Sequence, residues 1–240
     1  MLDINLIKGI IFDYGGTIDS NGKHWAEVLW DAYKGHSVPV TKEQFREAYV
    51  YAERYLATNP VITPNDNFND LLVKKVNLQV KYLIDKEFLS NDKKSEEYCL
   101  AISNQCYTFA LNLISEEKVI LEYLHKNYPV VLVSNFYGNI NAVLDDFELS
   151  GYFNEIIESA VVGVRKPDPA IFDLGIQALN LPAENVVVIG DSYSKDIVPA
   201  SKNGCKTIWL KGLGWGDDAP DATADVIIED FAQLKKIFNI

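Results

Sequence analysis

The segment Ile10-Ile11-Phe12-Asp13-Tyr14-Gly15-Gly16-Thr17 constrains the fold of this chain more than any other. An apolar run that stops at an aspartate and a glycine pair is typical of a buried strand followed by a tight turn. In an open α/β fold, such a strand presents its carboxyl end to the crevice in which ligands bind. We therefore expect the Asp13 carboxylate at the ligand-binding edge of a parallel sheet.

The second half of the chain alternates between short apolar strands and amphipathic helices. Repeated βα units of this length require a parallel sheet with right-handed crossovers, so we predict an α/β fold with a doubly wound, Rossmann-like core. A glycine-rich segment at 212–218 is expected to be a loop. The predicted strands are 6–13, 129–134, 155–160, 186–190 and 207–210, and the predicted helices between the later strands are 138–148, 168–180 and 194–203.

Residues from about 20 to 113 have helical periodicity throughout and form a predicted insertion of four helices. The second of these begins with a capping-box pattern, Thr41 to Gln44, and the last pair is expected at about 66–88 and 92–113. Ser115 is a plausible first cap of a further helix. We therefore divide the chain into a core, residues 1–18 and 114–240, and an α-helical cap, residues 19–113.

The composition fits a globular protein and excludes some partners. A formal net charge of −12 over 240 residues argues against a nucleic-acid or anionic-membrane surface, because both would need a basic face. We expect no leader peptide, because the N-terminus lacks the pattern of one, and no membrane span. Three cysteines without metal-ligand spacing favour the cytoplasm, and the oligomeric state stays open.

Three further motifs follow predicted strands or precede a predicted helix. Ser134-Asn135 ends the second strand, Lys166 lies in a Lys-Pro-Asp-Pro segment, and Asp191 and Asp196 follow a later strand. The carboxylates of Asp13, Asp191 and Asp196 should therefore converge on one sheet edge, where they would repel one another without a cation. Mg²⁺ prefers a few carboxylate oxygens and fills its remaining positions with water and phosphate.

In this order, the four motifs resemble those of the haloacid dehalogenase superfamily, whose members are mostly Mg²⁺-dependent phosphatases. The position of the helical insertion is similar to that of the C1 cap of this family. The resemblance implies that Asp13 is the nucleophile and that the metal ligands are Asp13, Asp191 and the Gly15 carbonyl, with Asp196 assisting through water or by orienting Lys166. It further implies that the Lys166 ammonium and the Ser134 hydroxyl contact the phosphoryl group, with the Asn135 amide nearby. The N–H groups of Tyr14 and Gly15 could complete an anion-binding nest.

Gly15 departs from the family pattern, because most family phosphatases have a second aspartate there that acts as general acid and base. Three hypotheses follow: a phosphatase in which a good leaving group, a water or a cap residue replaces that aspartate, a P–C bond hydrolase that resembles phosphonoacetaldehyde hydrolases, or a catalytically weak binding protein. The P–C hypothesis needs a Schiff-base lysine in the cap, such as Lys23, Lys34 or Lys42. His24, at the hinge into the cap, is a weaker candidate for a substitute acid.

We favour the first hypothesis, a Mg²⁺-dependent phosphohydrolase that acts on a small phosphorylated metabolite through an aspartyl-phosphate at Asp13. Dehalogenation is disfavoured, because haloacid dehalogenases need no metal and generally lack the Gly-Asp signature that this chain keeps. The sequence leaves the substrate itself undetermined, because the cap residues that would contact it are not identifiable from spacing.

Overall fold

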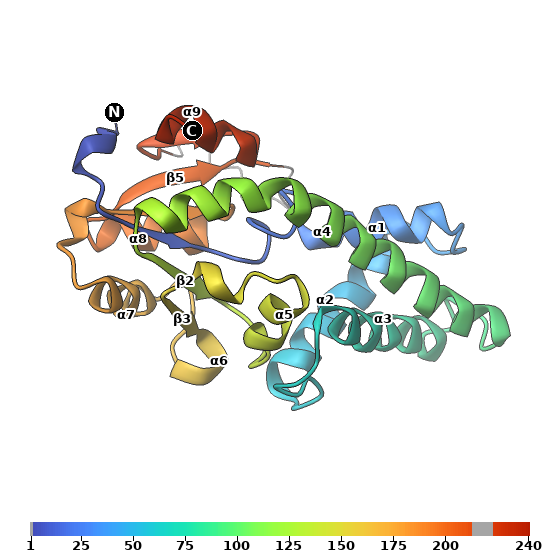
Figure 1. The fold of residues 1–240 in the computed structure, drawn as a ribbon. Helices are drawn as coiled ribbons and strands as arrows, with labels where there is room; N and C mark the ends of the chain where they lie inside the picture. The colour runs from blue at the N-terminus through green and yellow to red at the C-terminus, as the bar shows by residue number, and fades with distance from the viewer. Residues whose placement is uncertain (1, 213–222) are drawn as a thin grey trace.

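A computed structural model describes residues 2–212 and 223–240 and contains a parallel six-stranded sheet (Figure 1). The strand order is β3-β2-β1-β4-β5-β6, which is the doubly wound order with its reversal point at β1 and β4. This confirms the predicted fold class. The strands are β1 (Gly9–Phe12), β2 (Val130–Ser134), β3 (Glu155–Glu158), β4 (Val186–Gly190), β5 (Lys206–Leu210) and β6 (Val226–Ile228).

The central strands are buried on both faces, which explains why they are continuous apolar runs. Ile10 and Phe12 of β1 point to one face, and Ile11 points to the other. The first face packs against α4, α5 and α9, and the second against α7 and α8. The helices outside the insertion are α5 (Ile140–Asp146), α6 (Ser159–Val162), α7 (Ala170–Leu179), α8 (Val198–Lys202) and α9 (Leu234–Phe238), with short turns η1 (Ile4–Leu6), η2 (Ser150–Tyr152), η3 (Ala183–Asn185), η4 (a π-helix, Tyr193–Ile197) and η5 (Phe231–Gln233).

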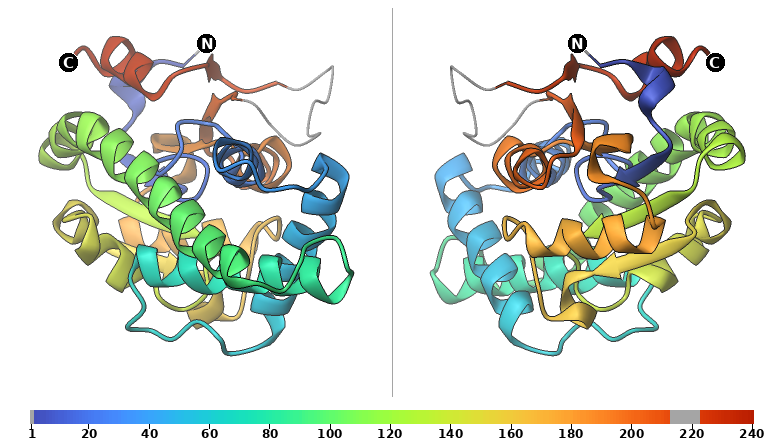
Figure 2. Two further views of the ribbon diagram at one scale, coloured as in Figure 1. Left: turned by 90° about the vertical axis from the view of Figure 1, so that its right-hand side faces the viewer. Right: turned by 90° about the vertical axis from the view of Figure 1, so that its left-hand side faces the viewer.

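The insertion consists of α1 (Trp25–Gly35), α2 (Lys42–Thr58), α3 (Phe68–Asp85) and the first half of α4 (Lys93–Asn127). These helices face the viewer on the left of Figure 2, and the sheet faces the viewer on the right. Both predicted hydrogen bonds of the capping box at the start of α2 are present, between Thr41 and Gln44.

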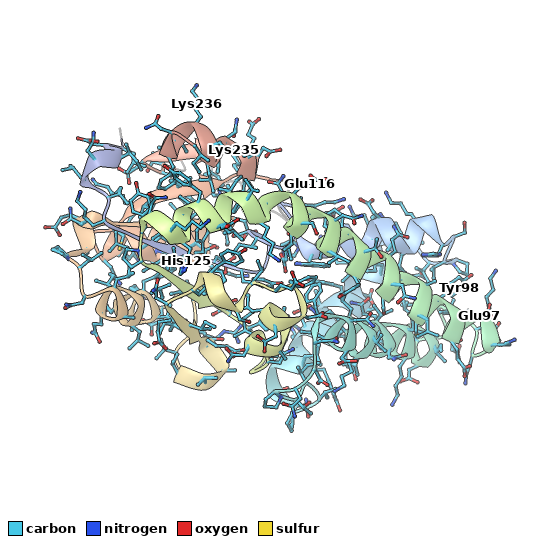
Figure 3. The ribbon with its side chains drawn as sticks, viewed as in Figure 1. Glu97, Tyr98, Glu116, His125, Lys235 and Lys236 are labelled. Atoms are coloured by element: carbon cyan, nitrogen blue, oxygen red, sulfur yellow. The ribbon has the colours of Figure 1, made fainter. Side chains whose placement is uncertain are left out.

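The predicted helix start at Ser115 is wrong, because α4 is a single helix of 35 residues. The Ser115 hydroxyl donates to the Leu111 carbonyl at 2.7 Å, so this serine bonds back into its own helix instead of capping a new one. In Figure 3, Tyr98 marks the part of α4 beside the insertion, and His125 marks the part beside the sheet. The predicted division at 113/114 thus falls inside a continuous helix.

Two other differences concern the C-terminal region. The strand β6 is not among the predicted strands, because it has only three residues and so leaves little apolar pattern. The predicted loop at 212–218 lies outside the described residues, apart from Gly212.

Candidate active site

The carboxyl ends of three neighbouring strands position the site. Asp13 follows β1, Ser134 is the last residue of β2, and Asp191 follows β4. Because β1 pairs with both β2 and β4, these residues reach the same edge of the sheet. The Asp13 amide also donates to the Ile189 carbonyl at 2.9 Å, which fixes the start of the turn against β4.

A buried lysine joins two of the aspartates. The Lys166 ammonium lies 2.5 Å from Asp13 Oδ1 and 2.6 Å from Asp196 Oδ1. Burial alone would lower the Lys166 pKa, but the charges and hydrogen bonds of Asp13 and Asp196 raise it above its usual range. Lys166 is therefore a fixed positive charge beside the Asp13 carboxylate.

The remaining aspartate completes an acidic cluster. One oxygen each from Asp13, Asp191 and Asp196 lies within 4.8 Å of the others, a donor set that fits Mg²⁺. Burial, together with the neighbouring charges of Asp13 and Asp196, raises the Asp191 pKa well above its usual range. A bound cation would remove this repulsion, and Asp13 and Asp191 are the side chains that would hold it, with the Gly15 carbonyl between them in sequence.

Asp196 has other partners that limit its part in such a metal site. Its Oδ1 accepts from Lys166 and its Oδ2 accepts from the Ser192 amide at 3.0 Å. Burial and the Asp13 charge raise its pKa to about 6, although Lys166 opposes them. These contacts fit the expectation that Asp196 orients Lys166.

The residues of the first turn behave differently from one another. Gly16 has a φ of +99°, and a Cβ there would overlap the Asp191 carboxylate. Gly15 has no such restriction, and the nearest atom to a Cβ at Gly15 is Asp19 Oδ2 at 4.0 Å. The Tyr14 ring is buried and packs edge-on against Phe136, so only its backbone can belong to the site.

Two polar residues of this turn belong to the site although the sequence motifs did not single them out. The Thr17 hydroxyl donates to Asp13 Oδ2 at 2.9 Å and so orients that carboxylate. Asp19 is buried, accepts from the Gly16 amide at 2.7 Å and also bonds the Trp25 side chain. Burial raises the Asp19 pKa to about 7. The signal that could have identified both is their position immediately after the glycine pair.

The other expected site residues line the same cavity, which has a volume of about 1030 Å³. Ser134 is buried in its wall. Asn135 exchanges two hydrogen bonds with the Lys166 backbone, at 2.9 and 3.0 Å, and thereby holds the lysine loop against β2. His24 also lines the cavity, but its Nδ1 accepts from the Ala26 amide and caps α1.

The insertion supplies the opposite wall of the cavity through residues of α1, α2 and α3, such as Trp25, Glu53 and Lys75. The lysines nominated for a Schiff base belong to other places. Lys23 and Lys34 pair with Asp31, and Lys42 pairs with Glu27. Of the lysines in the described cap helices, Lys75 is the one that lines the cavity.

The fold and the site define an α/β hydrolase with an acidic centre at the carboxyl edge of its sheet. The sequence matches the haloacid dehalogenase-like hydrolases over residues 7–204, and the chain belongs to this family. None of the described helices is long and apolar enough to cross a membrane.

Several relatives agree with this assignment. A glyceraldehyde 3-phosphate phosphatase of Pyrococcus abyssi is 38% identical over 86% of this chain and 82% of its own. The enzyme of the same name from Pyrococcus furiosus is 27% identical, but the match spans only 60% of that enzyme. A phosphoglycolate phosphatase of Photorhabdus laumondii is 25% identical over 95% of this chain and 91% of its own.

Solved structures share the fold. The hydrolase YfnB of Bacillus subtilis, bound to magnesium, has a TM-score of 0.59 at 19% identity and covers 98% of this chain and 99% of its own. A dehalogenase has a TM-score of 0.65 at 14% identity and covers 99% of this chain and 98% of its own.

Proposed function

We propose that this hydrolase is a Mg²⁺-dependent phosphatase that acts on a small phosphorylated metabolite, with Asp13 as the nucleophile. The observation that carries the proposal is the Lys166 ammonium between Asp13 and Asp196, with the Asp191 carboxylate beside them. A dehalogenase needs no metal, so a cluster of three carboxylates favours phosphoryl transfer. The names of the sequence relatives support the same reaction.

The reaction would proceed in two displacements at phosphorus. An Asp13 oxygen attacks the phosphoryl group, the phosphorus–oxygen bond of the ester breaks, and the alcohol leaves with a proton. Water then attacks the phosphorus of the aspartyl-phosphate, releases orthophosphate and restores the Asp13 carboxylate. Mg²⁺, when bound, would supply charge neutralisation at the phosphoryl oxygens.

The chain's own residues would prepare both steps. The Thr17 hydroxyl would hold one Asp13 oxygen, which leaves the other to face the phosphorus. Lys166 would neutralise the phosphoryl charge from a position that Asp196 and Asn135 fix. The Ser134 hydroxyl would donate to a phosphoryl oxygen.

The cap would exclude water and contact the rest of the substrate. The cavity volume of about 1030 Å³ suits a metabolite and not a macromolecular phosphate. Three free, buried cysteines support a reducing compartment such as the cytoplasm.

P–C bond cleavage is the weaker alternative. A Schiff-base lysine must be neutral when it attacks a carbonyl. Lys75 lies 2.8 Å from a Glu53 oxygen, and this carboxylate raises the Lys75 pKa against the effect of burial. A lysine held in its charged form is a poor nucleophile.

Phosphate release from a panel of small esters, with Mg²⁺ or with a chelator, tests the proposal. We expect turnover that requires Mg²⁺ and that disappears in Asp13→Asn, which keeps the shape of the side chain but removes the nucleophile. Circular dichroism and a thermal melt of Asp13→Asn provide the folding control. Undiminished turnover in a folded Asp13→Asn would overturn the mechanism.

A further inference from the structure

A second polar cluster lies in the cavity wall, away from the phosphoryl-transfer residues. It consists of Glu53 from α2, Lys75 from α3 and Tyr137 from the loop after β2, and we name it the cap ion pair with its tyrosine. Tyr137 follows closely after Ser134 and Asn135 in the sequence. The cap and the core therefore contribute to this cluster together.

The three side chains are tightly connected. The Lys75 ammonium lies 2.8 Å from Glu53 Oε1, and the Tyr137 hydroxyl donates to Glu53 Oε2 at 2.7 Å. The ammonium also lies 5.2 Å from the centre of the Tyr137 ring. Burial alone would raise the Glu53 pKa, but the Lys75 charge and the hydrogen bonds from Lys75 and Tyr137 hold it below its usual range. Both members of the pair are therefore charged, and their net charge is zero.

This pair lies where an apolar contact is expected. Lys75 is only 7% exposed and lies on the buried face of α3 between Leu72 and Val76. An ion pair taken out of water loses much of its Coulombic gain to desolvation, so apolar side chains would stabilise the helix packing at least as well. A ligand in the cavity gives such a pair a use that helix packing does not.

The charge balance of the pair decides which ligand suits it. A hydroxyl group both donates and accepts, so it can bond Glu53 and Lys75 together. A carboxylate at the same place would gain the Lys75 ammonium but would meet the Glu53 carboxylate, and like charges at close range repel. The pair thus selects for a neutral hydroxyl group and against a second anion.

The other basic residues of the cavity do not change this balance. Among the lysines and arginines of the described cavity wall, Lys75 and Lys166 are buried. Lys166 is engaged by two aspartates. The remainder, Arg54, Arg165, Lys195 and Lys211, are exposed, so water and salt screen their charges.

We propose that Glu53, Lys75 and Tyr137 form the subsite for the part of the substrate distant from its phosphate, and that this part carries hydroxyl groups and no second anionic group. This rests on the proposed phosphatase function. The substrate class is that of phosphorylated polyols and sugars. Glu53 and Lys75 are specificity residues, and Tyr137 positions Glu53.

Two esters of similar size test the subsite, 2-hydroxyethyl phosphate and phosphoglycolate, which differ in a terminal hydroxyl against a carboxylate. The wild-type enzyme should have at least about a tenfold higher kcat/KM for the hydroxyl ester, because the site would leave an unpaired buried charge against the other. Glu53→Gln keeps the shape of the side chain but gives the subsite a net positive charge. It should reduce that ratio by at least about tenfold, mainly through KM, with Tyr137→Phe changing it in the same direction.

Glu47→Gln is the matched control. Glu47 lies on the same helix and also accepts from a tyrosine hydroxyl, that of Tyr82, but it lies outside the described wall of the cavity. This variant should leave the ratio unchanged. Equal loss for both esters in Glu53→Gln would indicate a cap–core contact with no selective role, and a wild-type preference for phosphoglycolate would also overturn the proposal.

Binding to Asp13→Asn, measured by calorimetry with both esters and Mg²⁺, separates the subsite from the chemistry. Tighter binding of 2-hydroxyethyl phosphate, lost in Asp13→Asn/Glu53→Gln, supports the subsite even if the wild type releases no phosphate. Equal or reversed binding of the two esters refutes the subsite while leaving the phosphatase proposal intact. Absence of Mg²⁺-dependent phosphate release from every ester by the wild type refutes only the proposed function.

Discussion

The substitution Gly15→Asp tests whether proton transfer limits this enzyme. The structure leaves room for the new side chain, because Gly15 has no left-handed φ and the nearest atom to its added Cβ is Asp19 Oδ2 at 4.0 Å. That is an ordinary van der Waals separation. An aspartate there would follow Asp13 by two positions, which matches the acid and base of typical family phosphatases.

The expected gain depends on the leaving group. General acid–base help is worth about 10²–10⁴-fold, so kcat for an alkyl phosphate such as glycerol phosphate should rise within that range. This corresponds to about 2.7–5.5 kcal/mol of the activation barrier. An aryl ester such as p-nitrophenyl phosphate should gain much less, because its phenolate leaves without a proton. The neighbouring Asp13 and Asp19 carboxylates would also raise the pKa of the new aspartate, which suits an acid.

The assay is phosphate release from both esters by the wild type, Gly15→Asp and Gly15→Asn under saturating Mg²⁺. Gly15→Asn is the control, because it has the same size and no transferable proton, and it should bring no gain. Unchanged kcat for the alkyl ester in a folded Gly15→Asp that still binds Mg²⁺ would refute the reasoning. Another group would then already move the proton, and Asp19 is the carboxylate next to Gly15.

Three other predictions follow from buried groups, a strained turn and the acidic cluster. Burial and the Asp230 charge raise the pKa of Glu117 from 4.5 to about 9, so the folded chain keeps a proton that the unfolded chain loses, and stability is lost as the pH rises through this range. Urea unfolding of Glu117→Gln should therefore show a gain over the wild type that grows by about 3 kcal/mol from pH 4.5 to 7, at roughly 1.36 kcal/mol per pH unit; a gain independent of pH would contradict the assignment. Gly16→Ala should cost about 1–3 kcal/mol of stability and displace Asp191, whereas Gly151→Ala, with nothing within 4 Å of its Cβ, should melt like the wild type. Mg²⁺ at 100 times its dissociation constant should add about 2.7 kcal/mol to the free energy of unfolding, and Asp191→Asn should lose most of this gain in a thermal melt.

The sheet and its functional edge were predictable because both depend on local patterns. Each central strand is a short apolar run, and the residue after the run must lie at the carboxyl edge. This rule alone was enough to bring Asp13, Ser134 and Asp191 together. The break at Ser115 failed because a serine can bond to the carbonyl four residues before it, as Ser115 does to Leu111, without ending a helix.

Contacts between the cap and the core depended on tertiary packing and were not predictable in the same way. Nothing in the spacing of Glu53 and Tyr137 indicates that two helices and a loop bring them within hydrogen-bonding distance. Asp19 likewise has the sequence context of an ordinary turn residue, and only its burial beside the Gly16 amide gives it a raised pKa.

Lys75 nevertheless left a signal in the sequence. Leu71, Lys75, Gln79 and Leu83 recur every four residues along α3, so the apolar stripe of this helix carries a charge where a core side chain belongs. A lysine on such a stripe must either reach the surface or find a buried partner, because an isolated buried ammonium is too costly. Since α3 belongs to the cap of a hydrolase, the cavity wall is the natural place for that partner, and Glu53 occupies it. A charged residue on the apolar face of a cap helix is therefore a specificity signal that the amino-acid sequence carries by itself.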